Sequence, residues 1–186
     1  MSNIALKNVR LSFPQIWKAV GFNESTPVDQ HKYSATFLIE KGSENDKKMQ
    51  QAIVDAANAK WGKKADTILA QIRGNTNKFA YQDGDLKEYD GYAGHMSIKA
   101  STKSRPLLVD KDRTPVVEED GVLYAGCYVN AVVSVYAYDV SGNKGITAAL
   151  VGIQFSRDGD AFGTSKPTAD ALFDDLTEGS EAADFI

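Results

Sequence analysis

The sequence predicts a mainly β domain with one inserted helix, followed by an acidic tail. Apolar and polar side chains alternate over 31–40 and over 127–138, which is typical of half-buried strands. Apolar residues recur at helical spacing over 44–61. The last residues, 168–186, include six acids and neither Lys nor Arg. We therefore expect one folded domain over 1–167 and a disordered acidic tail over 168–186.

The stretch 126–155 is the most β-like part of the chain and predicts two long strands. In the first strand, small apolar residues share one face, while Tyr128 and Tyr136 lie on the other. Gly, Asn and Asp in 139–145 predict a turn between the strands. The second strand is apolar at both parities almost to its end, which predicts that both of its faces are covered.

A further strand is predicted near the N-terminus. The apolar alternation over 4–13 changes parity near Lys7, which indicates a β-bulge. Pro14 should end this strand because proline has no N–H group to donate to a ladder. The long connection 15–30 is either functional or packs back onto the core, and we expect Trp17 to pack rather than project.

The inserted helix has signals at both ends. Ser43 and Asp46 provide an N-terminal cap, and Gly62 suits the position after the last turn, so the helix is expected over about 44–61. One or two further helical turns are predicted over 66–72.

The composition excludes several functional classes. No apolar run approaches a membrane span, and no export signal is present. The lone Cys127 cannot form an intrachain disulfide and suits a reducing compartment, and two His with one Cys exclude a Cys/His zinc site. No phosphate-binding loop, dinucleotide fingerprint or nucleophile elbow occurs. We expect no enzymatic activity, no cofactor and no membrane association.

An acidic cluster keeps a metal-dependent nuclease open as a minor alternative. The segment 75–94 has no clean period and is expected to be an irregular loop. Asp83, Asp85, Glu88 and Asp90 lie within it, but their spacing fits no calcium-loop pattern, and Asp and Gly collect in turns for structural reasons. We therefore predict no metal site.

The charge is unevenly distributed between the body and the tail. The formal net charge is −4. Without the six tail acids, 21 bases face 19 acids, so residues 1–167 carry about +2. A mildly basic body is compatible with a nucleic-acid partner, and an acidic tail can compete with that partner electrostatically.

Cationic and aromatic side chains are interleaved in the body, which indicates binding to single-stranded nucleic acid. A strand predicted over 95–105 has cationic side chains along one face, which would suit a groove that follows phosphates or a solvated, aggregation-blocking edge. Small barrels of the oligonucleotide-binding (OB) type bind single strands by stacking bases on rings over such a groove. We expect an OB-fold-type antiparallel barrel of five or six strands. The candidate DNA-binding residues are Trp17, Lys32, Tyr33, Lys78, Tyr81, Lys87, Tyr89, Tyr92, Lys99, Lys103, Arg105, Tyr128 and Tyr136.

The chain resembles the tailed-phage family of single-stranded-DNA-binding proteins with an OB fold and an acidic C-terminal tail. The resemblance rests on the order and spacing of short segments across the body. These segments are VRLSFP at 9–14, KYSATFL at 32–38, DGD at 83–85, YDGY at 89–92, YAGCYVNA at 124–131, and GITAAL at 145–150 through DGD at 158–160.

The resemblance implies a sequence-independent single-stranded-DNA-binding protein of phage replication, recombination and repair, in the cytoplasm of a bacterial host. It also implies that the tail recruits replisome or recombination partners and competes with DNA. The tail departs from the family pattern in its scattered acids and in the Ile that follows its last Phe. The tail candidates are Asp170, Phe173, Asp174, Asp175, Glu178, Glu181, Asp184 and Phe185.

A different class of function remains open. The tyrosine face could bind protein instead of DNA, as in a phage interaction or assembly protein whose cations are only solvated. The sequence also leaves the oligomeric state open, including a homo-oligomer.

Overall fold

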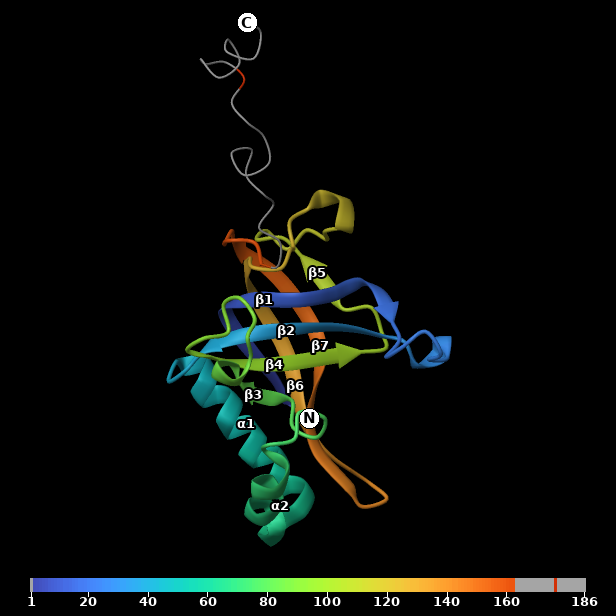
Figure 1. The fold of residues 1–186 in the computed structure, drawn as a ribbon, viewed down its shortest axis with the longest axis vertical. Helices are drawn as coiled ribbons and strands as arrows, with labels where there is room; N and C mark the ends of the chain where they lie inside the picture. The colour runs from blue at the N-terminus through green and yellow to red at the C-terminus, as the bar shows by residue number, and fades with distance from the viewer. Residues whose placement is uncertain (1, 163–175, 177–186) are drawn as a thin grey trace, which may run out of the picture.

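The fold is a closed β-barrel with helices packed at one end, as the computed structural model shows for residues 2–162 and Leu176 (Figure 1). The strands of the described residues are β1 (Ser2–Val20), β2 (Lys32–Glu40), β3 (Tyr81–Asp83), β4 (His95–Thr102), β5 (Leu107–Val109), β6 (Tyr128–Val140) and β7 (Asn143–Arg157). The α-helices are α1 (Glu44–Trp61) and α2 (Ala65–Ile72). Short 3-10 turns are η1 (Val28–Gln30), η2 (Gly62–Lys64), η3 (Gly84–Leu86) and η4 (Glu118–Asp120).

The barrel consists of five strands in the order β4-β2-β1-β6-β7, closed by pairing of β4 with β7. β3 extends the sheet beside β4, and β5 extends it beside β7. The OB-type barrel prediction is confirmed. The prediction of a wholly antiparallel barrel is wrong in one respect, since both β4 and β5 pair with β7 in parallel.

β1 is longer than its sequence predicted. The predicted bulge is present, because the register with β6 shifts between Leu6 and Val9. Pro14 does not end the strand, since it lies at a second irregularity between Ser12 and Gln15 in the register with β2, where no ladder N–H is needed. The strand continues to Val20, and the following connection projects at the right of Figure 1.

The hairpin of β6 and β7 is tighter than the predicted turn over 139–145. The two strands pair as far as Val140 and Asn143, so Ser141 and Gly142 alone connect them. Both have positive φ, 53° and 82°, as a twist-matched two-residue turn requires. The prediction that both faces of β7 are covered is also wrong, because Val151 is exposed on the face opposite Leu150 and Ile153.

Helix α1 begins and ends where its sequence predicted. Ser43 Oγ accepts a hydrogen bond from the Asp46 N–H at 3.3 Å, and Gly62 ends the helix with a φ of 56°. Met49, Ile53 and Ala57 pack into the barrel core, so α1 covers one end of the barrel and α2 lies beside it (Figure 1). Among the described residues, no helix combines the length and the apolar character needed to cross a membrane.

A buried carboxylate ties α1 to β3. Asp46 accepts hydrogen bonds from the Tyr81 hydroxyl at 2.6 Å, from the Gly42 N–H and from the Gln50 amide. Burial alone would raise the pKa of Asp46, but these three donors together lower it below its usual value. The network stabilises the junction of β2, α1 and β3 in its ionised form.

Candidate nucleic-acid interface

The outer face of β1, β2 and β4 presents polar side chains in regular rows. In the register of these strands, Ser12, Thr36 and Lys99 form one row. Gln15, Ser34 and Ser101 form the next row. The opposite parity of the same strands supplies core residues, including Leu11, Phe37 and Ile98. This division separates a polar sheet surface from the barrel interior.

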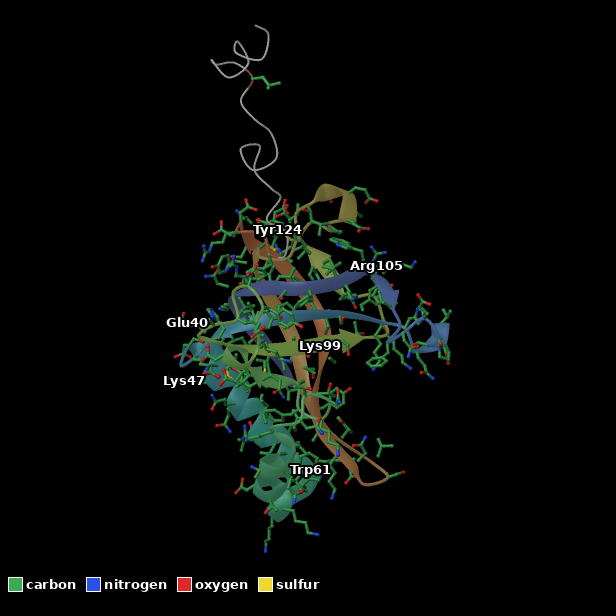
Figure 2. All side chains as sticks on the ribbon, viewed as in Figure 1. Glu40, Lys47, Trp61, Lys99, Arg105 and Tyr124 are labelled. Carbon is green, nitrogen blue, oxygen red and sulfur yellow. The ribbon has the colours of Figure 1, made fainter. Side chains whose placement is uncertain are left out.

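An open groove with three lysines lies on this face. The groove has a volume of about 580 Å³, and its lining includes Lys32, Lys99 and Lys103 but neither Asp nor Glu. Phe22, from the connection between β1 and β2, lines one side and is 97% exposed. Figure 2 shows Lys99 near the middle of β4. We call this feature the lysine groove.

Three aromatic rings pack together beside the lysine groove. Tyr89 lies between Phe13 and Tyr92, with ring centroids 4.9 and 5.2 Å apart and edge-to-face geometry. The Tyr92 hydroxyl bonds with Ser12 at 2.9 Å, so this ring lies over the row that includes Lys99. Burial raises the pKa of Tyr92. Tyr92 is only 3% exposed, whereas Phe13 and Tyr89 are each 54% exposed and present accessible ring surface.

The backbone at Phe13 is in an unusual conformation. Its φ is 46°, in the left-handed region that non-glycine residues rarely adopt and that costs about 1–3 kcal/mol. The irregularity that follows Ser12 in the register with β2 accompanies this φ. The side chain is thereby exposed beside Tyr89 although Leu11 and Ile16 on either side are buried.

An arginine and aromatic cluster continues the surface toward β6 and β7. The Arg10 guanidinium lies 4.1 Å from the centroid of the Phe162 ring and 5.6 Å from that of Tyr128. Arg10 also donates to the carbonyls of Gly126 and Asp160. Arg157 lies over the Tyr128 ring at 3.7 Å. These contacts resemble the cation–π arrangements that stabilise exposed rings.

Gly91 joins the two aromatic groups. Its φ is 80°, and a Cβ added there would come within 2.4 Å of the Phe162 ring. Phe162 therefore packs against the loop that supplies Tyr89 and Tyr92. The lysine groove, the three packed rings and the arginine and aromatic cluster therefore lie next to one another on the outer surface of the barrel.

The acidic loop forms an ion pair with a lysine. Lys41 Nζ lies 2.6 Å from a carboxylate oxygen of Asp83 and 2.6 Å from one of Asp85. These hydrogen bonds lower the pKa of both carboxyl groups. Asp85 also accepts the Gly94 N–H. Within 2–162, no group of three or more His, Cys, Asp or Glu side chains is arranged to hold a metal ion.

Several predicted residues come together on this surface. Lys32, Lys99 and Lys103 line the lysine groove. Tyr89, Tyr92 and Tyr128 belong to the aromatic groups described above. Two further candidates lie nearby in the chain: the half-buried Lys87 follows η3 in the loop of Tyr89, and the exposed Arg105 follows β4.

Other predicted residues lie elsewhere. Tyr81 is 3% exposed, and its hydroxyl donates to Asp46, so it is a core ring and cannot stack on a base. Trp17 packs partly buried against the core. Tyr33 is half-buried and has the strand parity opposite to that of Lys32 and Ser34, which line the lysine groove. The sequence could not separate these rings from surface rings because aromatic side chains serve both purposes on a β-sheet.

Two more candidates lie outside the interface. Lys78 precedes β3, and its carbonyl accepts the Ile146 N–H of β7. Tyr136 lines a groove beside α1 instead of the lysine groove. The predicted tail residues, from Asp170 to Phe185, lie outside the described residues.

Four residues of the interface were not predicted from the sequence. Arg10 has the parity of Ser12 on a strand whose core positions are Val9 and Leu11, so strand alternation could have identified it. The positive φ of Phe13 and the packing of Phe162 on Arg10 left no sequence signal. Arg157 lies beyond the stretch 126–155 that was predicted to form strands, although β7 continues to this residue.

Comparisons with known proteins agree on one family. The model of the Enterobacter phage Enc34 ssDNA-binding protein family matches residues 2–186. Putative protein p50 of Acyrthosiphon pisum secondary endosymbiont phage 1 is 44% identical over 181 residues, which cover 96% of each chain.

Solved structures show the same fold. The single-stranded DNA-binding protein of bacteriophage Enc34, solved in complex with ssDNA, superimposes with a TM-score of 0.65 at 22% identity, covering 87% of this chain and 89% of that one. A single-stranded DNA-binding protein encoded by bacteriophage T7 superimposes with a TM-score of 0.55 at 11% identity, covering 96% and 98%. On the family match and the close relative, this chain belongs to the Enc34 family of phage single-stranded DNA-binding proteins.

Proposed function

We propose that this protein binds single-stranded DNA without sequence preference and without catalysis, along the outer face of β1, β2 and β4. The lysine groove would neutralise phosphates and release their condensed counterions. The accessible rings of Phe13 and Tyr89 would stack on bases, which is worth about 1–3 kcal/mol per base. The Enc34 protein solved with ssDNA supports this choice of ligand.

The observation that carries the proposal is the juxtaposition of accessible rings and lysines on one sheet face. The Tyr92 hydroxyl bonds with Ser12, and Ser12 is two strands away from Lys99 in the same row. Neighbouring strands lie about 4.8 Å apart, so the ring group and Lys99 are separated by roughly 10 Å. A single strand can therefore contact both groups at once, with its bases toward the rings and its backbone over the lysines.

The strained backbone at Phe13 supports a functional reason for its exposure. A non-glycine residue with φ of 46° persists only where the surrounding structure enforces it, and such residues cluster at binding sites. An apolar ring that is 54% exposed gains little from folding alone. Stacking on a base would bury this ring.

The wider role is part of the same proposal. The protein would act in phage DNA replication, recombination and repair in the cytoplasm of the bacterial host. The acidic segment 168–186 would recruit replisome or recombination proteins and compete with DNA for the cationic face, since like-charged polymers exclude each other from one groove.

The proposal is tested by fluorescence anisotropy of a labelled oligothymidine titrated with the full-length protein. Tight binding that weakens with salt and exceeds binding to a duplex of equal length is the expected result. Absence of binding at both low and physiological salt would contradict the proposal. Salt-insensitive binding to a protein partner would instead favour an interaction or assembly function for the tyrosine face. Cleavage of the labelled DNA with Mg²⁺ present would contradict the non-catalytic role.

A further inference from the structure

The first residues of β1 have a free strand edge. β1 pairs with β6 from Ser2 onward but pairs with β2 only from Arg10 onward. The N–H and C=O of Lys7 point away from β6, and both bond with the Asn45 side chain, at 3.1 and 2.8 Å. The side-chain amide of Asn45 thus occupies the place of a partner strand at this one position.

The main-chain groups of Asn3 and Ala5 point the same way as those of Lys7. Groups on alternate residues of a strand face the same neighbour, and the register with β6 is regular from Ser2 to Leu6. Within residues 2–162, no strand pairs with this side of Asn3 and Ala5, and no side chain bonds to it. An unpaired edge of this kind is a template for an added strand.

This edge forms one wall of an open groove of about 1060 Å³, and α1 forms the other wall. We call it the α1–β1 groove. Its apolar lining includes Ile4, Ala52 and Val135. Its charged lining is mainly basic, with Lys47, Lys48 and Lys60 against the single acid Asp55, whose carboxylate already accepts a hydrogen bond from Gln51.

We propose that the acidic C-terminal segment 168–186 of the same chain docks in the α1–β1 groove as an added strand. Its six acids complement the three lysines of the groove. Its apolar residues, such as Leu172, Phe173 and Phe185, match the apolar lining. The unpaired edge at Asn3 and Ala5 supplies main-chain hydrogen bonds that any extended segment can use.

The segment can reach the groove from its own barrel. At roughly 3.3 Å per residue, the linker 163–167 spans up to about 17 Å and the whole stretch 163–186 up to about 80 Å, so the C-terminal part of the segment has the longest reach. A folded body of about 160 residues has a radius of gyration of roughly 15 Å. A tethered segment has an effective concentration on the order of millimolar, which favours docking within one chain. Edge-to-edge pairing of two copies is disfavoured because it would bring their lysines together.

The α1–β1 groove is separate from the proposed DNA interface. The two grooves share no lining residue, and Figure 2 shows Lys47 at the start of α1, well away from Lys99 on β4. The segment 168–186 would occupy the α1–β1 groove when it is docked, and it would lie at the cationic face when it competes with DNA. The inference does not rest on the proposed function, because it concerns contacts made in the absence of DNA.

Amide hydrogen exchange of the full-length protein, followed by NMR at low salt, tests the docking. The amides of Asn3 and Ala5 should exchange at least about tenfold more slowly than in a variant whose six tail acids are changed to Asn or Gln, because strand addition occupies these N–H groups. Lys47→Glu with Lys48→Glu should remove the protection. Lys63→Glu with Lys64→Glu, the same charge change outside the groove, should retain it.

Two results would overturn the inference. Equal exchange at Asn3 and Ala5 in the wild-type and neutralised-tail proteins would show that no segment occupies the edge. Tail-dependent protection that rises with protein concentration, together with a dimer by light scattering, would place the segment in a neighbouring copy. Slow exchange of the Val133 amide in every variant verifies that the barrel is folded. Oligothymidine titration of the same variants tests DNA binding separately.

Discussion

Replacing two lysines of the lysine groove tests the proposed DNA path most directly. Lys99 lies on β4 and Lys103 directly follows this strand. Both are exposed, and both line the groove. Neither side chain has an ion-pair partner within residues 2–162. The double variant Lys99→Ala with Lys103→Ala therefore removes two free cations without leaving a buried charge.

The expected effect follows from counterion release. On a single strand, each phosphate contact contributes about −0.7 to the slope of log affinity against log salt, so the variant should be less steep by about 1.4. At 0.1 M salt, each contact is then worth about fivefold in affinity relative to a 1 M reference. Two contacts correspond to a loss of about 25-fold, or about 1.9 kcal/mol.

The assay is oligothymidine anisotropy at several salt concentrations. The matched control is Lys63→Ala with Lys64→Ala, which removes the same charge from η2, outside the groove. The control should keep the wild-type slope and lose affinity by less than twofold. An unchanged slope in the Lys99 and Lys103 variant, or an equal loss in the control, would refute the assignment of DNA to this face.

Four further predictions concern base stacking, the Tyr81 hydrogen bond, stability in acid and the acidic segment. Phe13→Ala or Tyr89→Ala should weaken oligothymidine binding by about 1–3 kcal/mol. The salt slope should stay unchanged, because a stacked ring contacts no phosphate. An altered slope with unaltered affinity at low salt would argue against stacking. Tyr81→Phe should lower the free energy of unfolding in urea by about 1–3 kcal/mol without affecting DNA binding. The pKa of Asp46 is lowered in the folded protein, so the stability that its carboxylate contributes is present above about pH 4 and is lost as the pH falls further. Tyr81→Phe should make this loss of stability in acid smaller, because it removes one of the hydrogen bonds that lower the pKa. Deleting 170–186 should strengthen oligothymidine binding, most at low salt, and weaker binding would instead indicate a structural role for this segment.

Local sequence signals predicted the regular elements well where one face is buried. The alternation over 31–40 and the capping signals at Ser43 and Gly62 correspond to β2 and α1 almost residue for residue. These signals are local, since side-chain period and end-capping depend on residues a few positions apart. The same alternation placed Lys99 on the outer face of β4 and Lys103 just after the end of this strand.

Long-range packing decided the features that the sequence did not indicate. Pro14 was predicted to end a strand, but the β2 partner is irregular at that point and the strand continues. Tyr81 and Tyr89 look equivalent in the sequence, but Asp46 of α1 binds one in the core and Phe13 of β1 packs against the other at the surface.

The amino-acid sequence was therefore sufficient for the barrel class, the helix and the cationic strand, because each depends on a periodic pattern that neighbouring residues carry. The composition of the interface depended on the closed barrel, which brings Arg10, Phe13, Tyr89 and Phe162 onto one surface from distant parts of the chain. The free edge at Asn3 and Ala5 likewise exists only because β2 joins β1 late and α1 lies across an open groove from it. Contacts between residues far apart in the chain leave no periodic pattern in the sequence. They depend on which strands pair and in which register, and only the tertiary structure gives that pairing.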